Sequence, residues 1–153
     1  MHRYGNGKHR GSGTVDLGLE ANLQRALVHS LGEVRAVADR LEGWMRLHGY
    51  PRKDIFAVML TLHEAASNAV NHGNRRDPGK GVRISFLVTP AEVLVGVEDQ
   101  GKGFDLNLVS KEVTEEMRDR PNGRGLLLMR AYSTWMCFDP PGNRVTMCRR
   151  RSA

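Results

Sequence analysis

The sequence has few of the features that mark membrane-bound, secreted or metal-binding proteins. No apolar run approaches the roughly 20 residues that a bilayer-spanning helix needs. The first 13 residues are polar and Gly-rich, so they lack the apolar stretch of a secretory signal. The only two cysteines, Cys137 and Cys148, do not have the spacing of metal ligands. We therefore expect a cytoplasmic protein that makes no contact with a membrane.

The same two cysteines lie in segments that we expect to form a hairpin, across which they would face each other. Buried thiols in a reducing compartment are one interpretation, and a disulfide or redox pair is the other. The sequence leaves both interpretations open.

Aromatic residues are also scarce, at 6% of the sequence, and the body of the chain does not interleave them with basic residues as a base-stacking surface requires. The formal net charge of +6 lies at the two ends. Three basic residues fall in residues 1–13 and three in residues 149–153, which leaves 17 basic and 17 acidic residues in the body. We therefore expect no direct contact with nucleic acid. Binding of a polyanion by the two basic ends, which would otherwise be solvated, is an alternative.

The 153 residues, 40% of them hydrophobic, suit a single domain with a real core, and they contain no internal repeat. We expect a flexible basic leader over residues 1–13 and one domain over residues 14–150. Apolar spacing, helix-capping signals and turn residues predict helices over 31–48, 51–73 and 125–132 and strands over 23–28, 82–89, 93–98, 135–138 and 144–148. This order predicts an α+β two-layer sandwich, with helices on one face of a mixed, mostly antiparallel sheet.

One face of the second predicted helix carries polar side chains. Glu64, Asn68, Asn71 and His72 stand at i, i+4, i+7 and i+8, while alanine and valine occupy the other face. Asparagine is a poor helix former, so two within four positions need a reason. Its amide oxygen is a hard ligand that suits Mg²⁺, and a carboxylate one turn away can deprotonate a hydroxyl. A solvated helix face with mixed polar residues is the alternative.

A glycine motif, Asp99-Gln100-Gly101-Lys102-Gly103, follows a predicted strand directly. Its two glycines let the backbone turn sharply and approach a ligand closely. The carboxylate of Asp99 can accept a hydrogen bond from an exocyclic amine such as that of adenine. An ordinary hairpin turn has a similar composition, so this motif alone does not distinguish a ligand-binding loop from a turn.

A second glycine motif, Asn122-Gly123-Arg124-Gly125-Leu126, opens the third predicted helix. Free N–H groups at a helix N-terminus and the positive end of the helix dipole favour an anion. The side chain of Arg124 adds a charge that can reach a phosphate. A plain loop that leads into a helix is the alternative.

The order and spacing of these motifs resemble the N, G1 and G2 boxes of the ATPase superfamily that contains gyrase, Hsp90, histidine kinases and MutL. The resemblance covers residues 20–150 and implies the Bergerat-type ATP-binding fold. Too few residues precede Glu64 for the phosphoacceptor helices of a histidine kinase, and the stretch from Phe104 to Gly123 is short for an ATP lid. The length and motifs together resemble the anti-sigma-factor serine/threonine kinase family.

The resemblance implies ATP and Mg²⁺ as cofactors and a role for each motif. Glu64 would be the general base, and Asn68 would hold Mg²⁺. Asp99 would recognise adenine, with Thr146 nearby. The other implied nucleotide contacts are Asn71, His72, Gly101, Gly103, Gly123, Arg124, Gly125 and Leu126.

The resemblance also implies protein partners. Members of that family sequester a sigma factor as homodimers, and they phosphorylate a serine or threonine of an antagonist with the STAS fold. We therefore expect a sigma factor, a STAS antagonist and a second copy of this chain as partners. A module that binds nucleotide and protein without catalysis would use the same pocket, so that alternative stays open, as does polyanion binding through the basic ends.

Overall fold

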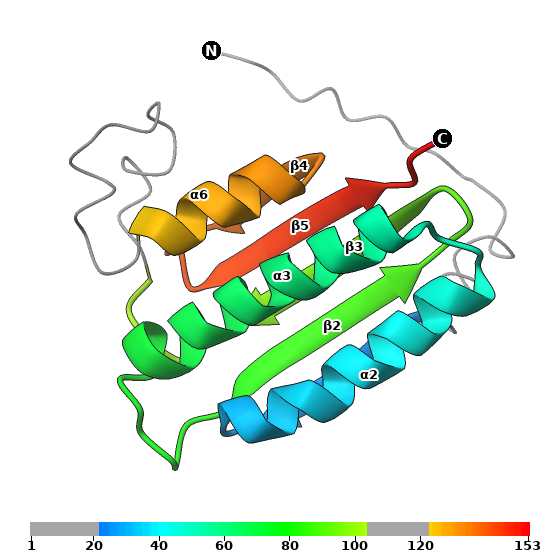
Figure 1. Ribbon diagram of the computed structural model, residues 1–153. Helices are drawn as coiled ribbons and strands as arrows, with labels where there is room; N and C mark the ends of the chain where they lie inside the picture. Colours follow the sequence, from blue (N-terminus) through cyan, green and yellow to red (C-terminus); the bar gives the residue numbers. More distant parts are fainter. Residues whose placement is uncertain (1–21, 104–122) are drawn as a thin grey trace, which may run out of the picture.

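A computed structural model describes residues 22–103 and 123–153 of the chain (Figure 1). In chain order its elements are β1 (Gln24–Val28), α2 (Leu31–Leu47), α3 (Arg52–Asn68), the π-helical turn η1 (Ala69–Gly73), β2 (Val82–Val88), β3 (Glu92–Glu98), α6 (Gly123–Tyr132), β4 (Trp135–Asp139) and β5 (Arg144–Arg150). Every helix and strand expected from the sequence is present, with ends that differ by a few residues. The predicted leader (1–13) and the short stretch expected in place of a lid (104–122) lie outside the described residues. None of the described helices has the length and apolar character needed to span a bilayer.

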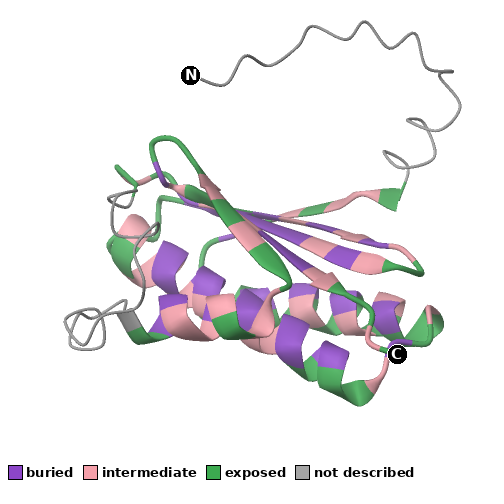
Figure 2. Cartoon of the chain, turned by 90° about the horizontal axis from the view of Figure 1, so that it is seen from above, coloured by how far each residue is buried: buried purple, intermediate pink, exposed green. Residues whose placement is uncertain are grey.

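The five strands form one sheet in the order β1-β2-β3-β5-β4, and every pairing among these described strands is antiparallel. The helices α2, α3 and α6 lie on one face of this sheet, and no described element covers the other face (Figures 1 and 2). The predicted α+β two-layer sandwich is therefore confirmed. The sheet was expected to be mixed, but the described pairings include no parallel one.

The core lies between the helices and the sheet. Alternate residues of β2 are buried, and Val145 and Met147 of β5 are buried on the same face, because successive side chains of a strand point to opposite faces. The buried residues of α2 and α3 recur at helical spacing and pack on this surface. The large side chains with almost no exposure include Leu41, Met45, Leu62, Phe86 and Met129. Because α3 packs on β3 and β5 and also beside α6, its polar residues lie close to all three elements.

Local signals in the sequence set the ends of α2. The Ser30 hydroxyl accepts a hydrogen bond from the N–H of Glu33 at 3.3 Å and so caps the helix. The Glu33 carboxylate accepts in turn from the N–H of His29 at 2.9 Å, one residue before the donor of a standard capping box. Gly49 follows the helix with φ +71°, a left-handed conformation that glycine adopts without steric penalty.

Two of the C-terminal arginines bond within the fold, so the expectation of a solvated basic end over residues 149–153 holds only in part: Arg150 and Arg151 are exposed, but Arg149 is not. The Arg149 guanidinium pairs at 2.9 Å with Asp54, a fully buried carboxylate at the start of α3. Arg151 donates to two backbone carbonyls between α2 and α3, at 3.1 and 2.9 Å. A run of charges in the sequence does not reveal partners that lie 95 to 103 residues away in the chain.

The two cysteines are free thiols and do not face each other. The register of the β4–β5 hairpin places Cys137 opposite Thr146 and Cys148 opposite Trp135. Cys148 is buried and Cys137 is exposed. The structure therefore favours thiols over a disulfide, but only one of the two has the burial that we expected.

Candidate functional site

The first and third sequence motifs meet where α6 packs beside α3. Gly125 lies in the first turn of α6, over the polar face of α3. A Cβ atom at this position would lie 2.9 Å from Glu64 Oε2 and 3.3 Å from Asn68 Nδ2. A larger residue would have to displace those groups, so glycine at position 125 allows the close approach without a shift of either.

Asn68 is buried, with 9% of its surface exposed, whereas Glu64 beside it is half-buried. The Asn68 amide nitrogen lies 4.0 Å from the sulfur of Met129, and its amide oxygen accepts no hydrogen bond from the described residues. An amide oxygen beside a carboxylate fits the preference of Mg²⁺ for hard oxygen ligands. The described residues contain no group of three or more His, Cys, Asp or Glu side chains that could hold a metal. A magnesium ion at Asn68 would therefore take most of its ligands from phosphate and water.

Asp99 follows β3 and is buried, with 8% of its surface exposed. Burial raises the pKa of its carboxyl above the ordinary value, a 2.7 Å hydrogen bond from the N–H of Gly101 opposes the rise, and nearby Glu98 adds to it. A Cβ atom at Gly73 would overlap the Asp99 carboxyl, and one at Gly101 would overlap the carbonyl oxygen of Gly73. The second motif is therefore packed backbone to backbone against the end of η1.

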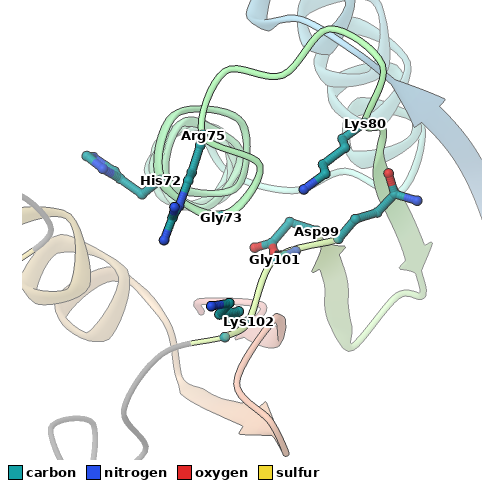
Figure 3. Close-up of a pocket in the computed structure, with 9 residues that line it drawn as sticks. His72, Gly73, Arg75, Lys80, Asp99, Gly101 and Lys102 are labelled. Carbon is teal, nitrogen blue, oxygen red and sulfur yellow. Dashed lines mark hydrogen bonds between the residues drawn. The ribbon is translucent and has the colours of Figure 1, made fainter.

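These contacts form one wall of a pocket of about 440 Å³ (Figure 3). The pocket lies between the end of η1, the loop after it and the turn after β3, and Arg75 and Lys80 point into it from the loop. Its lining consists of His72, Gly73, Arg75, Lys80, Asp99, Gln100, Gly101, Lys102 and Gly103. Three of these side chains are positively charged and only one is negative, so the pocket attracts anions.

A second, much smaller cavity connects the Asp99 end of the site with the Asn68 end. It lies between α3, the end of β3 and the β4–β5 turn, and both Asn68 and Asp99 line it. The rest of its lining is mainly apolar: Ala65, Ala69, Val97, Met129, Phe138, Gly142, Asn143 and Val145. At about 10 Å³ the cavity has room for one water molecule, so its walls must separate before a larger group fits.

The end of the polar helix departs from regular spacing. In η1 the N–H of Asn74 bonds to the carbonyl of Ala69 at 2.8 Å, five residues back. This wider turn moves later side chains off the column that 3.6-residue spacing predicts. His72 lines the large pocket as predicted, but Asn71 lines neither of the two cavities described above.

Thr146 was expected near Asp99, but the structure does not bring the two together. It lies between Val145 and Met147, which are buried against the helices, so its side chain faces the opposite side of the sheet. Asn143, in the β4–β5 turn, lies beside Asp99 instead. Its Nδ2 donates to the Asp99 carbonyl at 2.8 Å, and its carbonyl accepts from the Asp99 N–H at 2.9 Å.

The remaining predicted residues differ in how close they come to the site. Gly123 begins α6, and Arg124 is exposed in its first turn. Gly103 lines the large pocket with φ +89°, packed against the carbonyl of Pro141. Leu126 is 6% exposed, and its side chain lies in the hydrophobic core.

Arg75 and Lys80, which line the pocket, and Asn143 and Asn74 beside it are polar residues that the sequence did not single out as ligand contacts. In the sequence Asn143 follows Gly142 and is typical of a turn, and Asn74 is typical of a polar loop. Asn74 is nevertheless buried and hydrogen-bonded to Gly81 and Gln100. Asn74 differs from an ordinary loop asparagine only by its burial, and burial cannot be recognised from a single sequence.

Comparisons with known proteins agree with this geometry. The family profile of the histidine kinase-like ATPase domain matches residues 27–149. The serine-protein kinase RsbW of Oceanobacillus iheyensis is 26% identical over 99 residues, a match that covers 60% of this chain and 61% of that protein. The chain thus spans less than two thirds of the length of this relative. The matched range includes all three motifs, and the chain belongs to the histidine kinase-like ATPase domain family.

Proposed function

We propose that this chain binds Mg-ATP and transfers the γ-phosphoryl group to a serine or threonine of a partner protein with the STAS fold. Its chief support is the meeting of the three motifs: Gly125 packs on Glu64 and Asn68, and Asn68 shares a cavity with Asp99. The name of the RsbW relative, a serine-protein kinase, supports the choice of acceptor. In the same proposal, a homodimer of the chain sequesters a sigma factor that the STAS partner releases.

The nucleobase belongs at the Asp99 end of the site. Oδ1 of Asp99 accepts from the N–H of Gly101, so Oδ2 is the oxygen that an exocyclic amine can reach. Burial in a low dielectric strengthens such a hydrogen bond. The neighbouring glycines Gly73 and Gly101 allow the turn after β3 to pack directly on the end of η1, which fixes the position of the Asp99 carboxyl.

The triphosphate extends from this end toward α6. The first turn of α6 offers backbone N–H groups and the positive end of the helix dipole, and Arg124 adds a full charge. The amide oxygen of Asn68 is the protein ligand for Mg²⁺. When bound, the metal neutralises phosphate charge and makes the γ-phosphorus more open to attack.

Glu64 acts as the general base in this proposal. As the acceptor hydroxyl oxygen attacks the γ-phosphorus, its proton passes to the Glu64 carboxylate. The new oxygen–phosphorus bond forms while the bond from the γ-phosphorus to the β,γ-bridging oxygen breaks, and ADP leaves with that oxygen. The contact between Gly125 and Glu64 holds the carboxylate beside the first turn of α6, where the γ-phosphate is expected.

Replacing Glu64 separates binding from transfer. Glu64→Gln should slow phosphoryl transfer to the STAS partner by about 10²- to 10⁴-fold, the usual contribution of a general base. The affinity for ATP, measured by calorimetry with and without Mg²⁺, should stay unchanged. Glu42→Gln, on α2 and away from the site, is the matched control and should change neither quantity. Transfer can be followed by the mass of the partner protein. Transfer by Glu64→Gln at the wild-type rate refutes the base, and a wild-type chain that binds no ATP refutes the whole proposal.

Two alternatives give different results in the same assay. A nucleotide-gated module without catalysis would bind ATP but leave the mass of the partner unchanged. Polyanion binding through both basic ends has lost support at the C-terminus, because Arg149 and Arg151 already have partners within the fold.

A further inference from the structure

One buried side chain, Asn74, closes the loop that follows η1. This residue is 2% exposed, although asparagine in a loop is usually solvated. Its Nδ2 donates to the carbonyl of Gly81 at 2.9 Å, and its Oδ1 accepts from the N–H of Gln100 at 2.7 Å. Its own N–H donates to the carbonyl of Ala69 and so closes the last turn of η1. A single residue therefore joins the end of η1, the start of β2 and the turn after β3.

The side chain of Gln100 links two of the same segments. Its Oε1 accepts from the N–H of Gly81 at 3.1 Å. Gln100 stands between Asp99 and Gly101, the two residues that pack against Gly73. The hydrogen bonds of Asn74 and Gln100 thus hold the turn after β3 against the end of η1, at the contact that forms the pocket wall.

The backbone that follows Asn74 is strained. Arg75 and Arg76 have φ values of +51° and +58°, in the left-handed region that residues with a side chain rarely adopt. Two such residues in succession persist only where the surrounding structure holds them. The bond from Asn74 to Gly81 closes this loop, and both Arg75 and Lys80 line the pocket from it (Figure 3).

We propose that Asn74 is a positioning residue that sets the width of the pocket of about 440 Å³ at its Asp99 end, where the nucleobase is expected. Through Gly81 and Gln100 it fixes the turn carrying Asp99 and Gly101 at its distance from Gly73. The inference rests on the proposed function, because it takes the base to lie at the Asp99 end. Asn74 does not line the pocket, so it acts through the backbone of its neighbours. It therefore governs the affinity for ATP and leaves the transfer step alone.

Asn74→Asp tests this role with almost no change in shape. Aspartate keeps an oxygen acceptor for the N–H of Gln100 but replaces the donor with an oxygen that repels the carbonyl of Gly81. We expect the dissociation constant for ATP, measured well below the unfolding temperature, to rise about tenfold or more. The rate of phosphoryl transfer at saturating ATP should stay within about twofold, which is the pattern of lost ground-state binding.

Asp54→Asn is the matched control. Asp54 is also a buried polar residue that joins distant segments, since it accepts from the N–H of Ser152 at 2.8 Å and from Arg149 at 2.9 Å. It lies at the start of α3, whereas Asn74 follows the end of η1. Both variants should lower the unfolding temperature, but only Asn74→Asp should weaken ATP binding. A purely structural role for Asn74 predicts no such difference.

Hydrogen exchange on the unmodified chain gives a readout that does not depend on a variant that folds. The N–H groups of Gly81 and Gln100 should exchange more slowly once ATP is bound, because the base braces the segments that Asn74 joins. Equal affinity of Asn74→Asp and wild type, or equal loss in both variants, overturns the inference while the proposed function stands. Unchanged exchange at both amides also overturns it. A wild-type chain that binds no ATP removes the proposed function, and the inference falls with it.

Discussion

A methyl group added at Gly125 should weaken the proposed chemistry while leaving the stability of the fold almost unchanged. The Cβ of Gly125→Ala would lie 2.9 Å from Glu64 Oε2, and ordinary contact begins at 3.4 Å, so the carboxylate must move by at least about 0.5 Å. The amide of Asn68, at 3.3 Å, must also shift slightly. The substitution therefore disturbs the proposed general base and the proposed metal ligand together.

The effect on stability is the difference between two small terms. Alanine is favoured over glycine in a helix by about 0.5–1 kcal/mol, and moving Glu64 away from its preferred rotamer costs about 0.5–1.5 kcal/mol. The free energy of unfolding should therefore change by less than about 1 kcal/mol. Phosphoryl transfer is more sensitive to position, because a displacement of about 1 Å can cost 100-fold. For a displacement of about half that size we expect a loss of about tenfold or more.

Gly96→Ala provides the matched control. Its Cβ would lie 2.6 Å from Ser85 Oγ, a tighter contact, but within the sheet and away from α3 and α6. Urea unfolding measures the stability of both variants, and the mass of the STAS partner measures transfer. Gly96→Ala should lose stability and transfer phosphate at the wild-type rate. Gly125→Ala should keep its stability and transfer phosphate more slowly. If Gly125→Ala transfers phosphate as fast as wild type, the close approach of α6 to Glu64 has no part in the chemistry.

Two buried carboxylates should affect stability with opposite signs. The fold raises the pKa of the Asp99 carboxyl above its ordinary value of 3.8. Its contribution to the free energy of unfolding is therefore complete below pH 3.8 and is lost as the pH rises through the pKa of the folded state. Asp99→Asn should therefore raise the unfolding temperature at neutral pH and weaken ATP binding, and thermal melts with and without ATP check both. Burial alone would raise the pKa of Asp54, but hydrogen bonds from Ser152 and Arg149 outweigh burial and lower the pKa below 3.8. The stabilisation by Asp54 is therefore present above pH 3.8 and is lost as the pH falls through the pKa of the folded state. Asp54→Asn should cost about 3 kcal/mol in urea unfolding at pH 7, and an unchanged midpoint would contradict that ion pair's role.

The helices and strands could be predicted from the sequence because their signals are local. Ser30 starts α2 with its own side chain, and Gly49 follows the end of that helix. The core face of each strand alternates with its open face, and the apolar pattern of the residues indicates which is which. The meeting of Glu64 and Asn68 with Gly125 could be predicted only through the order of the motifs, which resembled a known family. Spacing alone does not tell which helices pack together.

The rest of the site depends on contacts and rotations that a single sequence does not encode in a readable way. A shift of one residue moves a strand side chain to the other face, which is why Thr146 points away from the helices while its neighbours point toward them. The extra residue in η1 turns Asn71 out of the predicted column. The sequence around Asn74 predicts an ordinary loop residue, and only its burial and its hydrogen-bond partners in the structure distinguish it.

The glycines of the motifs matter mainly because they allow close approach, and only secondarily because they are flexible. A Cβ atom at Gly73 would meet the carboxyl of Asp99, one at Gly101 would meet Gly73, and one at Gly125 would meet Glu64. In each case the atom that would be struck belongs to a segment far away in the sequence. At Gly101 the struck atom belongs to another backbone, and at Gly73 and Gly125 it belongs to a carboxyl group of the proposed site, so these close approaches fix the dimensions of the site. For this reason the buried amide of Asn74, which bonds to Gly81 and to Gln100 between Asp99 and Gly101, can control a ligand that it never touches.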